Sequence, residues 1–138
     1  MRPIDEIIVH CSDTEAGKDF KAADIRRWHI KGNGWKDIGY HFVIDIDGTM
    51  ECGRPVSMVG AHCADHNATT IGICYVGGKD HGEHADTRTE AQKRSLQSLI
   101  AVLKSCFPTI SKVSGHKDYA KRDCPCFDAK SEYNSLVQ

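Results

Sequence analysis

The side chains with the most reactive chemistry gather near the C-terminus, in the segment GHKDYAKRDCPCFD at residues 115–128. This segment holds one histidine, His116, and two cysteines, Cys124 and Cys126. Imidazole nitrogen and thiolate sulfur are preferred zinc ligands in proteins. Because Cys124 follows His116 by eight residues, the intervening loop can turn back and place the thiol beside the imidazole.

A third candidate ligand, His10, ends an apolar segment, IDEIIVHC, at residues 4–11. Two histidines and one thiolate would leave a fourth position open for water, as catalytic zinc sites do. In an extended segment Cys124 and Cys126 would point in opposite directions, so only one should reach the ion. No C-x-x-C pair occurs in the chain, so the spacing is not that of a structural zinc module.

Two other interpretations of this segment remain open from the residues alone. A disulfide between Cys124 and Cys126 would close a very tight ring across a proline, so it is disfavoured. A nucleophilic cysteine that uses His116 as its base would need the same residue types.

The overall composition narrows the class of protein. The net charge is −1 and the isoelectric point is near 6.7, which argues against nucleic-acid binding through a strongly basic face. No apolar run approaches the roughly 18 residues of a membrane span, and acidic residues stand where a signal peptide would carry its apolar stretch. We therefore expect a monomer made in the cytoplasm, without membrane association, with thiols rather than disulfides.

The hydrophobic pattern predicts a single α/β domain over residues 1–138, with a central mixed β-sheet flanked by helices. A helix is predicted over residues 18–35, with Ala23 on its apolar side and Gly32 and Gly34 at its end. Thr89 and Gln92 form a capping-box pattern before the clearest helix. The remaining predicted elements are strands at 4–11, 69–78 and 111–116, a hairpin at 39–55, and helices at 89–106 and 130–137.

Four segments in this order resemble the type-2 N-acetylmuramoyl-L-alanine amidases, a family that includes small phage lysozymes and peptidoglycan recognition proteins. The resemblance extends from about Ile4 to Phe127, and the motifs are specific in combination. The segments are IIVHCSDT, GWKDIGYHFVIDIDGTMECGRP, GAHCADHNATTIGICYVGG and GHKDYAKRDCPCFD.

The resemblance implies one zinc ion per chain in an open groove at the edge of the sheet. The implied ligands are His10, His116 and Cys124, whereas Cys126 occupies a variable position of its motif. The implied reaction is hydrolysis of the amide between the lactyl group of N-acetylmuramic acid and L-alanine in bacterial peptidoglycan. An endolysin that acts on the wall after release or delivery is the simplest biology.

The resemblance also suggests residues that act beside the metal. Tyr40 matches a family tyrosine that can donate to the oxyanion. Arg122 stands where many phage members carry lysine, and an arginine can bind an oxyanion but cannot readily donate a proton. The general acid is therefore open, with zinc-bound water, His62 and Lys121 as candidates. The expected substrate-binding residues are His29, Trp35, His62 and Asn67.

Two further questions remain at the level of the sequence. His81 and His84 are interpreted as part of a solvated loop, with a second metal there left open. A peptidoglycan-binding module of the same fold without hydrolysis is the alternative function. Pure recognition members tend to lose the ligand cysteine, so the retained Cys124 and Tyr40 favour the enzyme.

Overall fold

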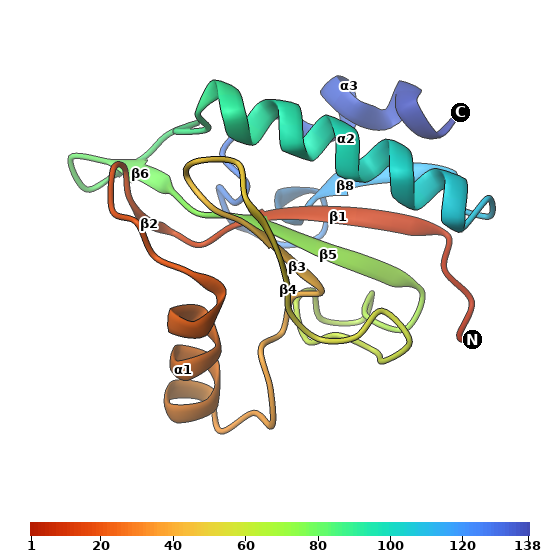
Figure 1. Cartoon of the computed structure of the whole chain (residues 1–138), viewed down its shortest axis with the longest axis horizontal. Helices are drawn as coiled ribbons and strands as arrows, with labels where there is room; N and C mark the ends of the chain where they lie inside the picture. Colours follow the sequence, from red (N-terminus) through yellow and green to blue (C-terminus); the bar gives the residue numbers. More distant parts are fainter.

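A five-stranded sheet forms the centre of the molecule in a computed structural model that describes all residues, 1–138 (Figure 1). Strand β1 (Glu6–Cys11) pairs in parallel with β5 (Thr70–Tyr75) and with β8 (Lys112–Gly115). Strand β3 (Phe42–Ile44) is parallel to β5, and β4 (Met50–Cys52) is antiparallel to β3. The predicted mixed sheet is therefore confirmed, and β5 is its central strand.

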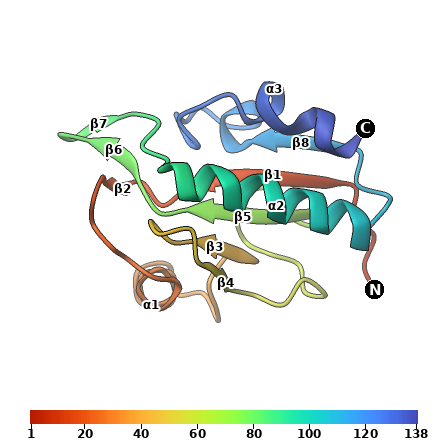
Figure 2. The same ribbon diagram turned by 45° about the horizontal axis from the view of Figure 1, so that its top comes forward.

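Helices cover both faces of this sheet (Figures 1 and 2). Helix α2 (Glu90–Cys106) crosses one face, with α3 (Ala129–Tyr133) beside it, and α1 (Ala22–Asn33) lies on the other side. Two short 3-10 helices, η1 (His116–Asp118) and η2 (Asn134–Val137), complete the chain. None of these helices is both long and apolar enough to cross a membrane.

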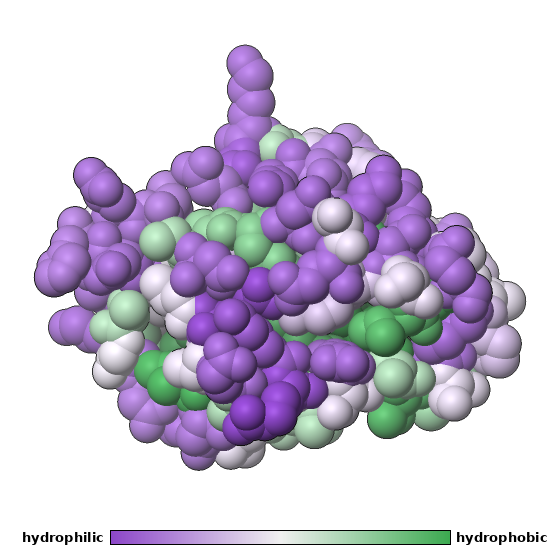
Figure 3. All heavy atoms as spheres, turned by 90° about the horizontal axis from the view of Figure 1, so that it is seen from above, coloured by the Kyte–Doolittle hydropathy of each residue, from purple (hydrophilic) through white to green (hydrophobic).

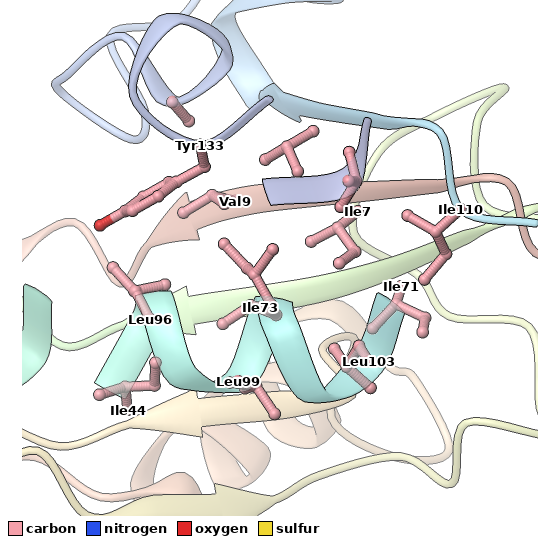
Figure 4. Packing of buried hydrophobic residues seen from close by; sticks show 14 of the residues in the cluster. Ile7, Val9, Ile44, Ile71, Ile73, Leu96, Leu99, Leu103, Ile110 and Tyr133 are labelled. Atoms are coloured by element: carbon pink, nitrogen blue, oxygen red, sulfur yellow. The ribbon is translucent and has the colours of Figure 1, made fainter. Parts of the chain in front are cut away.

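Alternation along β1 divides its side chains between the two faces. Ile7 and Val9 point toward α2 and pack in the main core with Ile71 and Ile73 of β5 and with leucines of α2 (Figure 4). His10 lies on the opposite face, because it is one residue out of phase with Val9. The imidazole of His10 therefore lies on the face of the sheet that α2 does not cover.

Helix α2 begins as its sequence predicts. Thr89 Oγ1 accepts from the backbone N–H of Gln92, and Gln92 Oε1 accepts from the backbone N–H of Thr89, at 3.1 and 2.9 Å. This reciprocal pair satisfies two amides that the helix start would leave free.

The face of the molecule on the side of α2 and α3 is mostly hydrophilic, with small hydrophobic areas (Figure 3).

Helix α1 differs in detail from the prediction. It starts at Ala22, because Asp24 accepts from the backbone N–H of Lys21 at 2.8 Å and closes the first turn there. Ala22 is buried and Ala23 is exposed, so the expected apolar position was wrong by one residue. The helix ends at Asn33 and is capped by Gly34, whose φ of 70° is the left-handed conformation that glycine adopts without strain.

A second, small sheet corrects the prediction of a solvated loop around His81 and His84. It contains β2 (Thr14–Glu15), β6 (Gly78–Asp80) and β7 (Glu83–His84). Strand β6 pairs with β2 in parallel and with β7 antiparallel, so His84 lies in a strand and His81 in the turn.

Candidate active site

The three expected ligands lie together at the carboxyl ends of two neighbouring parallel strands. His10 is near the end of β1, His116 follows β8 directly, and Cys124 lies in the loop beyond η1. One potential ligand atom of each lies within 4.8 Å of the others. Open α/β sheets place functional groups at this end, because the chain leaves the sheet there and side chains from separate strands converge.

Backbone hydrogen bonds bring Cys124 back to the strands. The N–H of Lys117 donates to the Cys124 carbonyl at 2.7 Å, which closes the loop after η1. The N–H of Cys11 donates to Cys124 Sγ at 3.2 Å, so the sulfur is held at the end of β1. The eight-residue spacing therefore produces the turn that the sequence suggested.

Cys126 lies elsewhere, for a different reason from the one expected. Its φ of 70° shows that the segment is not extended, so simple alternation does not decide where its thiol points. Cys126 Sγ lies 4.0 Å from Cys11 Sγ and 3.4 Å from the Gly78 carbonyl oxygen. Burial raises the pKa of the Cys126 thiol to about 12. All seven cysteines are free thiols in the structure, including Cys124 and Cys126.

The electrostatics keep the two candidate histidine ligands neutral. Burial lowers the pKa of His10 well below its usual value, and neighbouring His62, His116 and Arg122 lower it further. Burial and the charge of Arg122 also lower the pKa of His116. A metal ligand must offer a lone pair, so two neutral imidazoles and one thiol form a donor set that fits zinc.

Tyr40 lies where two cavities meet, and it lines both of them. Its ring centroid is 5.1 Å from that of His10 and 5.4 Å from that of His29. Burial raises the pKa of the phenol well above its usual value, and the nearby thiols of Cys74 and Cys124 raise it further. The hydroxyl therefore stays protonated and can donate a hydrogen bond.

The larger cavity has a volume of about 810 Å³ and includes His29, Trp35 and Asn67 in its lining. His29 Nδ1 accepts from the backbone N–H of Gly39 at 2.9 Å, so its Nε2 carries the proton. Trp35 is 36% exposed and packs edge-on against His29, with ring centroids 4.8 Å apart. The structure thus places three of the expected substrate-binding residues in one cavity.

Asn67 and His62 also form part of this cavity, but protein groups occupy much of their polar surface. Asn67 Oδ1 accepts from the backbone N–H groups of His62 and Cys63, which leaves the Asn67 amide N–H groups for other partners. His62 is buried, and its two ring nitrogens contact His10 and Thr70 at 2.9 and 3.2 Å. Burial lowers the pKa of His62 to about 3, so it holds no extra proton to donate at neutral pH.

The second cavity, about 370 Å³, lies on the other side of Tyr40 and includes Lys121 and Arg122. Arg122 lines both cavities, and its guanidinium is paired with no carboxylate. Lys121 borders only the smaller one. A cationic group without a counter-ion therefore faces the space beside His116.

His84 forms a bridge at the rim of the second cavity. Its Nε2 lies 2.8 Å from Asp13 Oδ1, and its Nδ1 lies 2.9 Å from Asp123 Oδ2. Both ring nitrogens of His84 therefore contact carboxylates, one on each side of the ring. The bridge joins the small sheet to the loop that carries Arg122 and Cys124.

Sequence reasoning missed Thr70, Gly72 and this bridge. Thr70 and Gly72 belong to β5, on the face that carries His10 in the neighbouring strand. A glycine inside a buried strand often marks the close approach of another group, so Gly72 offered a signal. Asp13 and Asp123 carry no comparable signal, because acidic residues in loops are common.

Comparisons with known proteins agree with this geometry. A family model described as N-acetylmuramoyl-L-alanine amidase matches residues 1–127. The endolysin of Klebsiella phage KP32 is 44% identical over 135 residues, which cover 96% of this chain and 88% of the relative. The endolysin of Escherichia phage T7 is 42% identical over 136 residues, with 96% and 89% covered.

A solved structure gives the same result at the level of the fold. The N-acetylmuramoyl-L-alanine amidase LysC from Clostridium intestinale superposes with a TM-score of 0.80 at 30% identity, covering 95% of this chain and 82% of that one. The segment that the family model matches, residues 1–127, contains His10, Tyr40, His116 and Cys124. On these grounds the chain belongs to the N-acetylmuramoyl-L-alanine amidase family.

Proposed function

We propose that this protein is a zinc-dependent, endolysin-like amidase that hydrolyses the bond between the lactyl group of N-acetylmuramic acid and L-alanine in peptidoglycan. Family membership and phage endolysins at 40–44% identity support amidase activity on peptidoglycan. The observation that carries the zinc dependence is the convergence of His10, His116 and Cys124 within 4.8 Å.

When bound to these three donors, one zinc ion would supply Lewis acidity and lower the pKa of a coordinated water. The remaining work belongs to the side chains around it. The protonated phenol of Tyr40, whose ring centroid is 5.1 Å from that of His10, would donate to the oxygen on which negative charge develops. The unpaired guanidinium of Arg122 adds positive charge from a neighbouring direction, where it also lowers the pKa of His116.

The two cavities suit a substrate that extends in both directions from the bond to be cut. They share Tyr40, His116 and Arg122, so the reacting bond would lie at their junction. The larger cavity offers the N–H of His29, the exposed ring of Trp35 and the amide of Asn67. These groups can bind the amides and hydroxyls of a glycopeptide, and we assign them to substrate binding.

We further propose that the protein is made in the cytoplasm, works as a monomer and reaches the wall after release. The name endolysin, carried by relatives that match nearly the whole chain, supports action on the wall after release. The cysteine-hydrolase interpretation receives less support, because Cys124 belongs to a group with two histidines that could hold a metal ion.

Digestion of purified peptidoglycan tests the reaction. An amidase releases new N-terminal alanine amines without new reducing sugar ends, and a strong chelator should abolish this release until zinc is restored. New reducing ends without amines would identify a glycosidase, which needs two carboxylates about the scissile bond. Activity that resists the chelator would favour a cysteine hydrolase, and wall binding without any new chain ends would favour the binding module.

A further inference from the structure

We propose that His62 is a positioning residue that sets the tautomer of His10 and thereby selects Nδ1 of His10 as the metal-binding atom. The proposal rests on the zinc site proposed above and extends it to the groups behind the ligands. Its basis is a buried chain of three hydrogen bonds that runs from His10 through His62 and Thr70 to the carbonyl of His66.

The far end of this chain fixes its direction. Thr70 Oγ1 lies 2.7 Å from the backbone carbonyl oxygen of His66, and a carbonyl oxygen can only accept. Thr70 therefore donates its single hydroxyl proton to the His66 carbonyl oxygen. The contact of 3.2 Å between Thr70 Oγ1 and His62 Nε2 must then use a proton on the imidazole, so His62 Nε2 is the donor.

The same logic continues to the ligand. No carboxylate pairs with His62, and a buried imidazole without a counter-ion is neutral, with one N–H and one lone pair. Because Nε2 carries the proton, Nδ1 is the acceptor. His10 Nε2, at 2.9 Å from His62 Nδ1, must donate to it. The lone pair of His10 is thereby left on Nδ1, the ring nitrogen with no protein partner.

The fold holds the His62 ring tightly in this place. A Cβ added to Gly72 would lie 2.6 Å from His62 Cγ, so only a glycine in β5 leaves room for the ring. The backbone N–H of His62 also donates to Asn67 Oδ1 at 2.9 Å. Strand register completes the arrangement, since Ile8 of β1 pairs with Gly72 and His10 lies two residues further on the same face.

These contacts prepare the ligand before any metal arrives. A histidine ligand whose second nitrogen is anchored loses less rotational freedom on binding and holds the correct tautomer. Loss of such an anchor typically costs 10- to 100-fold in metal affinity. The chain of contacts also gives Thr70 and Gly72 a role, although neither reaches the cavity.

A matched pair of variants tests the proposal in the full-length protein. His62→Asn keeps a hydrogen-bond acceptor near the position of Nδ1. His62→Leu introduces a side chain with almost the same shape as asparagine but with no acceptor. Zinc dissociation constants, measured by competition with a chromophoric chelator, should stay within about threefold of the parent for His62→Asn. They should rise by about 10- to 100-fold for His62→Leu. Equal affinity in both variants, whether normal or weakened, would overturn the proposal.

A second measurement uses the parent protein and does not depend on variants that fold. Nitrogen-15 spectra of histidine in the zinc-loaded protein should show His10 with a proton on Nε2 and the metal on Nδ1. They should show His62 with its proton on Nε2. The opposite tautomer at either residue would overturn the proposal.

The strand residues add a third test. Thr70→Ser keeps the hydroxyl and should bind zinc normally, and Gly72→Ala should displace the His62 ring and weaken binding. Normal zinc affinity in a folded Gly72→Ala variant would count against the role of His62. The inference and the proposed function fail separately: normal zinc binding without amidase products sinks only the function, and full amidase activity with unaltered affinity in His62→Leu sinks only the inference.

Discussion

The backbone N–H of Cys11 donates a hydrogen bond to Sγ of Cys124 across 3.2 Å. This hydrogen bond fixes the sulfur against the end of β1, next to His10. Cys126, only two residues further, makes its sulfur contacts with Cys11 Sγ and the carbonyl of Gly78. One cysteine of the pair is therefore directed to the candidate ligand group and the other to the small sheet.

The first prediction follows from this division of roles. The parent should hold one zinc per chain, Cys124→Ala should lose it, and Cys126→Ala should keep it. Metal content measured by mass spectrometry on purified, refolding-competent protein checks the three values. The opposite result, with zinc retained in Cys124→Ala and lost in Cys126→Ala, would mean that the wrong cysteine has been chosen.

The second prediction concerns the phenol of Tyr40. Tyr40→Phe removes only the hydroxyl, so the fold and the zinc content should be unchanged. Turnover should fall by on the order of 10²- to 10³-fold, because a donor to the developing oxyanion is lost. Steady-state rates on solubilised wall decide the matter, and nearly normal turnover would make Tyr40 a structural residue.

The third prediction separates charge from proton transfer at Arg122. Arg122→Lys keeps the charge and should retain much of the activity, whereas Arg122→Ala should lose at least about tenfold in kcat/KM, or about 1.4 kcal/mol of transition-state stabilisation. Lys121→Ala is the comparison variant, and it should lose less activity than Arg122→Ala, because Lys121 borders only the smaller cavity. An Arg122→Ala variant as active as the parent would direct attention to Lys121.

The main sheet and α2 were predictable because their signals are local and strong. Leu96, Leu99 and Leu103 recur with helical spacing, and the Thr89–Gln92 pair marks the helix start within three residues. The small sheet escaped prediction because its strands are two or three residues long, and their partners lie more than 60 residues apart in β2 and β6. Pairing of that kind depends on the finished fold and leaves little trace in composition.

The candidate ligand group was predictable for a similar reason: His10 and His116 each lie at or just beyond the end of an apolar strand, and the motifs around them are specific. The position of His62 was not predictable from local sequence. Its environment depends on the register that places Gly72 beside Ile8, and on the loop before β5 that brings His62 back to Thr70. The family resemblance suggested a substrate contact for His62, whereas the fold places both of its ring nitrogens against protein groups.

The fourth prediction tests how the ligand loop is supported. The Arg88 side chain is 2% exposed, pairs with Asp86 and Glu132 at 2.9 and 2.6 Å, and stacks 3.3 Å from the centroid of Phe127. Arg88→Ala should lower the free energy of unfolding by about 2–3 kcal/mol, less than the 3–5 kcal/mol lost where both charges are buried, because these carboxylates are partly exposed.

Urea denaturation of Arg88→Ala beside Arg88→Lys measures this cost. The lysine keeps one charge but loses the planar fork and the stacking on Phe127, so its stability should fall between the parent and the alanine variant. A loss below about 0.5 kcal/mol in Arg88→Ala, the range of ordinary surface substitutions, would contradict a supporting role.

The last prediction concerns the buried carboxyl of Asp45. One of its oxygens, Oδ1, has no hydrogen-bond partner, and the other lies 3.4 Å from Lys21 Nζ. Burial, followed by the neighbouring Glu51, raises the pKa of Asp45 to about 7. In the unfolded chain an aspartate has a pKa of about 3.9, so between about pH 4 and 7 the folded state holds a proton that the unfolded state has lost.

The free energy of unfolding should therefore carry a contribution from Asp45 that decreases as pH rises from about 4 to 7 and is constant above that range. Asp45→Asn cannot ionise and should remove this slope. The free energy of unfolding of the variant minus that of the parent should therefore be larger at pH 8 than at pH 5. His41 is buried and neutral, and its pKa is lowered to about 4, so its contribution to the free energy of unfolding rises with pH up to about 6.5. This contribution is the same in both proteins, so it cancels when the parent is subtracted from the variant. The exposed Asp5→Asn is the control and should follow the parent at both pH values. Parallel stability curves for Asp45→Asn and the parent would show that Asp45 is ionised throughout, with Lys21 as a sufficient partner.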